Sequence, residues 1–239
     1  MVRTLKLALV AVLAVPALAL AHPPGGKLAT TADEALRELK QGNERFAKGK
    51  ALSPTRGLNR VKEVASGQHP EAVILSCADS RVPPEILFDE GIGDLFVVRV
   101  AGNVSEPATT GSIEYAAEHL NVPLIVVLGH KKCGAVKATA EATGPVEGNI
   151  GAIVKELQPA VEAAKAAPGK RGLVDDAVYA NAELVAKQLF TESPVLTHLA
   201  HAGKIKIVTA IYDLDTGKVE WGDAAPAAEK GKHEGHDKH

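Results

Sequence analysis

Aromatic side chains are scarce in this sequence of 239 residues. Phe, Trp and Tyr together make up 3% of the chain, whereas hydrophobic residues of all kinds make up 46%. A core must therefore be built from aliphatic side chains, and the length suffices for one sizeable domain. The charged residues nearly balance, with a formal net charge of −2 at pH 7. Nucleic-acid binding normally needs a strong positive field, so we expect no nucleic-acid partner.

The N-terminal apolar run, Leu7 to Val15, is short for a membrane span of about 20 residues. It follows Arg3 and Lys6 and precedes a small-x-small cleavage pattern, Ala19-Leu20-Ala21. This order is typical of a secretory signal peptide. We therefore expect removal of residues 1–21, a periplasmic location and no stable membrane insertion after cleavage. A retained membrane anchor is the alternative.

Cysteine is nearly absent, since the chain has two, Cys77 and Cys133. In an oxidising compartment two cysteines commonly form a disulfide, and export favours that pairing. A small buried hydrophobic side chain is a further reading of each cysteine. A metal site is the third possibility, and the residues around the two cysteines distinguish among the three.

The pattern of the chain from residue 22 to residue 225 indicates one domain. Three apolar runs lack polar alternation, as strands buried on both faces of a parallel sheet do: Ala72–Ser76, Leu95–Val100 and Leu124–Leu128. Helical patterns lie around them: an N-terminal arm that starts after a capping box at Thr31, then Asn59–Ala65, Gly111–Leu120, Ala135–Ala142, Ile150–Ala166 and Val174–Phe190. A late strand, Ile205–Tyr212, turns into Val219–Trp221 as a hairpin.

This order predicts an α/β fold with a mainly parallel central β-sheet flanked by helices, extended by the C-terminal hairpin. Residues 226–239 are rich in His and Lys, and we expect them to form a disordered tail.

The first and third apolar runs are each followed by candidate metal ligands. Cys77 follows Ala72–Ser76, and His130 and Cys133 follow Leu124–Leu128. The carboxyl ends of parallel strands meet at one edge of a sheet, so the three side chains converge if the two strands are neighbours. Two thiolates and an imidazole suit zinc and leave a fourth position open. From spacing alone, zinc and a disulfide both remain possible.

Asp79 and Arg81 alternate with Cys77 in a C-x-D-x-R pattern. An extended chain can point all three side chains to one side. Arg81 can then hold the Asp79 carboxylate through two hydrogen bonds beside the open metal position. An ordinary loop salt bridge is the simpler reading of the pair.

Four motifs together resemble β-class carbonic anhydrases, and the resemblance extends from Thr31 to Trp221. The motifs are C-A-D-S-R-V-P-P-E at Cys77–Glu85, R-V-A-G-N at Arg99–Asn103, E-Y-A at Glu114–Ala116 and G-H-K-K-C-G at Gly129–Gly134. The resemblance implies zinc-dependent reversible hydration of carbon dioxide to bicarbonate and a proton, by attack of zinc hydroxide on CO2. It also implies a homodimer or dimer-based oligomer whose first helices reach the partner subunit.

Carried over position by position, the resemblance implies one Zn²⁺ per subunit and the following residues. Cys77, His130 and Cys133 are the zinc ligands, and Asp79 and Arg81 form the catalytic pair. The substrate cleft of plant-like members is matched by Gln68, Phe96 and Tyr115.

The resemblance also bears on the state of Asp79, which in this family either binds zinc or pairs with arginine. Members whose site closes at neutral pH have a tryptophan three residues before the first cysteine, where this chain has Leu75. In those members the tryptophan is part of a bicarbonate pocket. Arg99 matches another residue of that pocket, but members whose site stays open have this arginine too. We therefore expect a plant-like open site. Hydrolysis of COS or CS2 at the same centre is one alternative function, and zinc storage using the tail residues His233, His236 and His239 is another.

Overall fold

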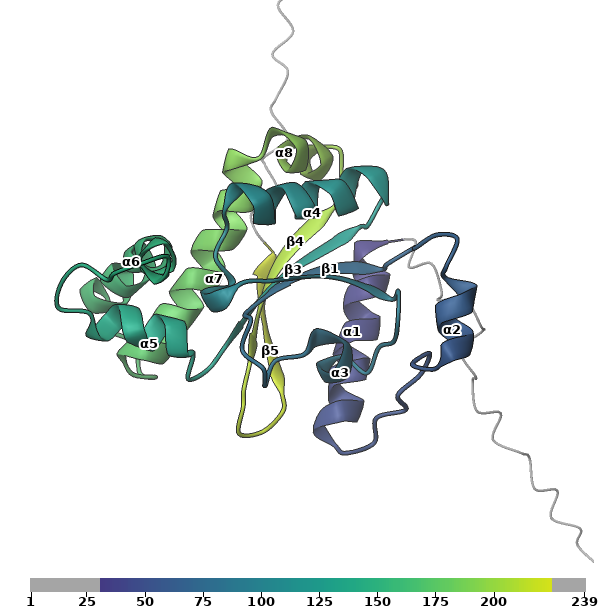
Figure 1. Cartoon of the computed structure of the whole chain (residues 1–239), viewed down its shortest axis with the longest axis horizontal. Coiled ribbons are helices and arrows are strands. Elements are labelled where there is room, and N and C mark those ends of the chain that lie inside the picture. The colour runs from purple at the N-terminus through teal and green to yellow at the C-terminus, as the bar shows by residue number, and fades with distance from the viewer. Residues whose placement is uncertain (1–30, 225–239) are drawn as a thin grey trace, which may run out of the picture.

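The computed structural model describes residues 31–224 and contains one central five-stranded sheet (Figure 1). The strands are β1 (Ala72–Ser76), β2 (Leu95–Arg99), β3 (Leu124–His130), β4 (Lys206–Tyr212) and β5 (Val219–Ala224). Their order is β2-β1-β3-β4-β5; the first four are parallel, and β5 pairs antiparallel with β4. The predicted α/β class and the hairpin extension are confirmed. The expected signal peptide and the expected tail lie outside the described residues.

Eight α-helices and one 3₁₀ turn are found in residues 31–224. They are α1 (Ala32–Ala47), α2 (Leu58–Glu63), α3 (Pro84–Leu87), η1 (Ala101–Asn103), α4 (Pro107–His119), α5 (Gly134–Glu141), α6 (Ile150–Ala166), α7 (Leu173–Glu192) and α8 (Pro194–His201). The hydroxyl of Thr31 accepts a hydrogen bond from the Glu34 amide at 3.2 Å, so the predicted start of α1 is confirmed. None of these helices combines the length and apolar character needed to cross a bilayer.

Strands β1 and β3 are buried along their whole length because both faces of the sheet are covered. On one face, Leu75 and Val127 pack with α4, α6, α7 and α8. On the other face, Ile74 and Val126 pack with α1 and α3 of the same chain. Figure 1 shows these two groups of helices on opposite sides of the sheet. The core is aliphatic, as the composition predicts: among the largest fully buried side chains of residues 31–224, Phe88 alone is aromatic.

The sheet order creates a switch point between β1 and β3. From β1 the chain first forms β2 on one side and then returns to form β3 on the other side. Ser76 at the end of β1 lies opposite Leu128 of β3, so both strands present their carboxyl ends at the same edge. Ligand sites in open α/β sheets are found at such a point.

Candidate metal centre and active site

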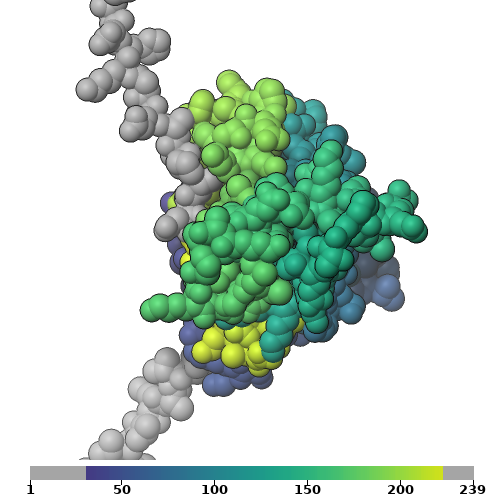
Figure 2. Space-filling model, turned by 90° about the vertical axis from the view of Figure 1, so that its left-hand side faces the viewer, coloured from purple at the N-terminus to yellow at the C-terminus, as the bar shows by residue number. Residues whose placement is uncertain are grey.

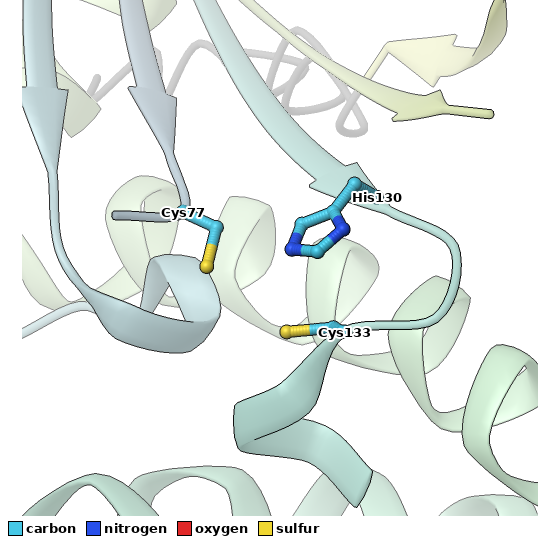
Figure 3. A group of neighbouring side chains, drawn as sticks. All are labelled: Cys77, His130 and Cys133. Atoms are coloured by element: carbon cyan, nitrogen blue, oxygen red, sulfur yellow. The ribbon is translucent and has the colours of Figure 1, made fainter. Parts of the chain in front are cut away.

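Cys77, His130 and Cys133 meet at the switch point. Cys77 directly follows β1, His130 is the last residue of β3, and Cys133 is the N-cap of α5. All three side chains are buried, and their sulfur and ring nitrogen atoms lie within 4.8 Å of one another. Figure 3 shows the two sulfurs and the imidazole pointing toward a common centre. Both cysteines are free thiols, so the convergence predicted from the sequence is present without a disulfide.

This donor set fits zinc. Nδ1 of His130 lies 2.9 Å from the carbonyl oxygen of Lys131, whereas Nε2 is buried without a hydrogen-bond partner. A ring that donates Nδ1–H to that carbonyl presents the lone pair of Nε2 toward the two sulfurs. Two cysteines and one histidine are ligands that zinc prefers, and three protein ligands leave one tetrahedral position for a reactant.

Several hydrogen bonds stabilise negative charge on Cys77. A hydrogen bond with the Cys133 thiol, supported by the backbone amides of Asp79 and Gly102, lowers the pKa of Cys77, although burial opposes the shift. The Gly102 nitrogen lies 3.3 Å from the sulfur. The same hydrogen bond, together with burial, raises the pKa of Cys133, although backbone amides at the start of α5 oppose the shift. The pair therefore favours one thiolate and one thiol, and metal binding would release the remaining thiol proton.

Asp79 and Arg81 form the ion pair that the C-x-D-x-R pattern predicts. Nε of Arg81 donates to Oδ1 of Asp79 at 2.9 Å, Nη2 donates to Oδ2 at 2.7 Å, and the Arg81 amide adds a third bond to Oδ1. These bonds hold the pKa of Asp79 well below its usual value. Oδ2 also lies 3.8 Å from Nε2 of His130, so an ionised carboxylate stands beside the donor set.

Two residues near Cys77 support the loop that carries it. Arg99 donates to the carbonyl oxygens of Cys77 at 3.1 Å and Asp79 at 2.6 Å. Its side chain therefore holds backbone in this structure, whereas the family resemblance suggested a bicarbonate pocket. The contact between Gly102 and Cys77 was not predicted. The glycine of the R-V-A-G-N motif was the one sign of this contact in the sequence. Gly102 has a φ of 72°, which residues other than glycine rarely adopt.

The three predicted cleft residues lie apart from the metal centre of their own chain. The rings of Phe96 and Tyr115 are 6.3 Å apart. Phe96 pairs with Val73, four residues before Cys77 on β1. Four residues of extended strand span about 13 Å. Gln68 precedes the amino end of β1, whereas Cys77 follows its carboxyl end. A single chain therefore does not bring these residues to the metal centre.

Comparison with known proteins agrees with this geometry. The "Carbonic anhydrase" family profile matches residues 72–219. The chain belongs to the carbonic anhydrase family. A carbonic anhydrase of Mycolicibacterium smegmatis is 44% identical over 189 residues, which are 78% of this chain and 91% of the relative. Carbonic anhydrase 2 of Mycobacterium tuberculosis is 42% identical over 189 residues, 77% of this chain and 89% of the relative.

Solved structures identify the class within the family. Two tetrameric β-carbonic anhydrases from Sordaria macrospora give a match with a TM-score of 0.63 at 26% identity, covering 80% of this chain and 98% of that chain. The Coccomyxa β-carbonic anhydrase, solved in complex with acetazolamide, gives a TM-score of 0.64 at 26% identity, covering 80% and 87%. The chain is thus a β-class carbonic anhydrase, an enzyme of reversible CO2 hydration that uses zinc, and its Cys-His-Cys group is positioned to bind the metal.

Proposed function

We propose that reversible hydration of CO2 takes place at the Cys77–His130–Cys133 centre, with these three residues holding one zinc ion per subunit. The observation that carries the proposal is the buried convergence of three ligand atoms within 4.8 Å, one of them the unpartnered Nε2 of His130. When bound there, zinc supplies the Lewis acidity that makes water a nucleophile near neutral pH.

Asp79 and Arg81 are the proposed catalytic pair. The Asp79 carboxylate accepts a hydrogen bond from the attacking water and fixes its orientation toward CO2. Arg81 donates a hydrogen bond to each carboxylate oxygen, which keeps Asp79 ionised and holds it beside the metal ligands. The ion pair reaches solvent on the Arg81 side, where the side chain is 57% exposed, so reactants can approach from that side.

We also propose that the site is of the plant-like open kind. Leu75, in the position where closing members have tryptophan, is fully buried in β1. A leucine has no N–H group to donate to an anion. Two side-chain hydrogen bonds hold Asp79 on Arg81. This pairing favours a site in which Asp79 does not bind the metal and the fourth ligand position stays open.

The proposed ligand set is tested by measuring bound zinc and CO2 hydration on the same samples. Wild-type protein should carry one zinc per chain and hydrate CO2 in stopped-flow assays. Cys77→Ser and His130→Ala should lose both, because two protein ligands hold zinc weakly. His198→Ala removes an exposed histidine outside the site and serves as the control. Stoichiometric zinc and normal turnover in either ligand variant would show that the assignment is wrong.

We further propose that the enzyme acts as a homodimer or a dimer-based oligomer, in which Gln68, Phe96 and Tyr115 line the partner's cleft. Support comes from the outer edge of β2, which pairs with no strand of residues 31–224. Apolar side chains also lie exposed in α2: Leu58 is 77% exposed and Val61 is 44% exposed. Exposed apolar surface beside an unpaired strand is typical of an interface between subunits.

A mixed dimer tests whether Gln68 serves the partner's centre. One chain carries Cys77→Ser and the other carries Gln68→Ala, so neither homodimer has a complete site. If Gln68 acts across the interface, each mixed dimer contains one fully wild-type site and mixing restores activity. If Gln68 acts within its own chain, mixing restores nothing. Sedimentation of the wild-type enzyme as a monomer would also contradict the proposal.

Export to the periplasm is proposed from the N-terminal sequence pattern alone. Expression of the full chain in a Gram-negative host should yield a periplasmic protein that lacks residues 1–21, as read by intact mass. Retention of the complete chain in the cytoplasm would contradict export.

A further inference from the structure

Helix α7 runs behind both loops that carry the metal ligands. Eight of its residues are buried, and it packs against β3, β4 and α6. Helices α6 and α5 cover it on the outer side, which is the face seen in Figure 2. A Cβ atom on Gly129, the residue before His130, would approach Val178 of α7 at 3.2 Å. The end of β3 therefore rests directly on this helix.

The first link from α7 to the metal centre runs through Asn181. This side chain is 2% exposed, and its Nδ2 donates to the carbonyl oxygen of Gly102 at 2.9 Å. The amide nitrogen of the same glycine lies 3.3 Å from the sulfur of Cys77. Gly102 has a left-handed φ of 72°, and a Cβ atom at this position would lie 2.8 Å from Leu157, so a larger residue does not fit there. Asn181 thus helps to hold the amide that faces the Cys77 sulfur.

The second link runs through Asp175 in the first turn of α7. Its Oδ1 accepts a hydrogen bond from the Lys132 amide at 2.9 Å. Lys132 lies in the turn between His130 and Cys133 and has a φ of 57°, a left-handed conformation that is unfavourable for a non-glycine residue. A hydrogen bond to a carboxylate is stronger than a neutral one and stabilises this turn.

We propose that α7 positions the zinc ligands, with Asn181 and Asp175 as its two positioning residues. Asn181 acts through Gly102 on Cys77, and Asp175 acts through Lys132 on the spacing of His130 and Cys133. Neither side chain is itself a member of the ligand group. Groups that orient metal ligands from outside typically change metal affinity by about 10–100-fold when removed. This inference rests on the proposed zinc centre and adds two residues to it.

The test compares zinc-loaded full-length variants for the rate of zinc transfer to an excess of chelator. Asn181→Ala and Asp175→Ala should release zinc about tenfold faster than wild type or more. Each should also shift the visible absorption spectrum of the cobalt-substituted protein, because that spectrum reports ligand geometry. Asp175→Asn keeps a side-chain oxygen that can accept the Lys132 amide and should stay close to wild type.

Two matched variants control for a general loss of stability. Asn43 is 5% exposed, donates to the carbonyls of Leu87 and Gly217 and accepts from the Val219 amide, so Asn43→Ala removes more hydrogen bonds than Asn181→Ala, among α1, α3 and the hairpin. Asp176, next to Asp175, accepts from the Gly169 amide, so Asp176→Ala removes a similar bond outside the metal loops. Both controls should keep the wild-type release rate and cobalt spectrum.

The proposal is overturned if Asn181→Ala and Asp175→Ala release zinc at the wild-type rate, or if the controls accelerate release equally. Asp175→Ala remains a decisive test even if Asn181→Ala fails to fold, since Asp175 is only half-buried. Complete absence of zinc from the wild-type enzyme would instead count against the proposed metal centre, so the two failures are distinguishable.

Discussion

The chemistry of Asp79 depends on how tightly Arg81 holds it. Two side-chain hydrogen bonds from Arg81, strengthened by a third from its amide, lower the pKa of Asp79, although burial opposes the shift. A carboxyl group with a lowered pKa keeps its charge throughout the neutral range and loses it only when the pH falls through the lowered value. Asp79 should therefore contribute no titration to activity between about pH 6 and about pH 9.

We predict that Asp79→Asn keeps stoichiometric zinc but loses about 10²–10⁴-fold in kcat, because an amide cannot replace a charged acceptor. Arg81→Ala should also depress activity, since it releases Asp79 toward the metal. Stopped-flow hydration with zinc analysis of the same samples measures both effects. Normal kcat in zinc-loaded Asp79→Asn would remove Asp79 from the mechanism.

The residues of the ligand group were predictable from sequence, whereas the residues that support them were not. Cys77 directly follows one apolar run, and His130 and Cys133 lie in the short G-H-K-K-C-G motif after another, so local patterns were enough to bring them together. Asn181 and Asp175 act through backbone groups that are 79 and 43 positions away in the chain. No short motif contains such a pair.

At the scale of elements, the strongly periodic segments were predicted well, and two helices that start at prolines were missed. The predicted helix Ile150–Ala166 has the observed bounds of α6. Helices α3 and α8 were missed because both start at prolines, which are usually interpreted as breaks. Strand β3 continues two residues beyond its predicted end, because Gly129 and His130 pair with Ile211 and Tyr212 of β4.

The close approach of α1 and α3 depends on Gly42. A Cβ atom at this position would lie 1.7 Å from the carbonyl oxygen of Phe88. We predict that Gly42→Ala lowers the free energy of unfolding by about 1–3 kcal/mol despite the better helix propensity of alanine. Gly144→Ala is the control, because a Cβ there meets nothing within 4 Å, and it should stay within about 0.5 kcal/mol of wild type. Urea titration measures both, and equal stability of the two variants would contradict the packing argument.

At the scale of the whole molecule, a buried acidic pair lies far from the metal edge of the sheet. Burial, with repulsion from Glu71 and Asp94, raises the pKa of Glu90 to about 9. Burial, with repulsion from Asp94 and Glu38, raises the pKa of Glu71 to about 8. A carboxyl group whose pKa is raised by folding contributes stability below its ordinary value of 4.5 and loses that contribution as the pH rises toward the folded value.

We therefore predict that Glu90→Gln raises Tm relative to wild type at about pH 9 and much less at about pH 6, since glutamine carries no charge to bury. Each 1 kcal/mol of relief corresponds to about 2–4 °C in a domain of this size. Glu192→Gln, at an exposed position, should show no such pH dependence. Thermal melts at both pH values measure the difference, and an equal shift at the two pH values would show that Glu90 does not titrate in this range.

We propose that the enzyme hydrates CO2 at an open zinc centre, with Asp79 held by Arg81. The most direct measurement is the rate of CO2 hydration per bound zinc between about pH 6 and about pH 9. We predict a gradual rise governed by a single pKa near 7, the value expected for water activated by zinc. Near-zero activity below about pH 8 with a steep cooperative rise above it, or no hydration by fully zinc-loaded enzyme at any pH, would contradict the claim.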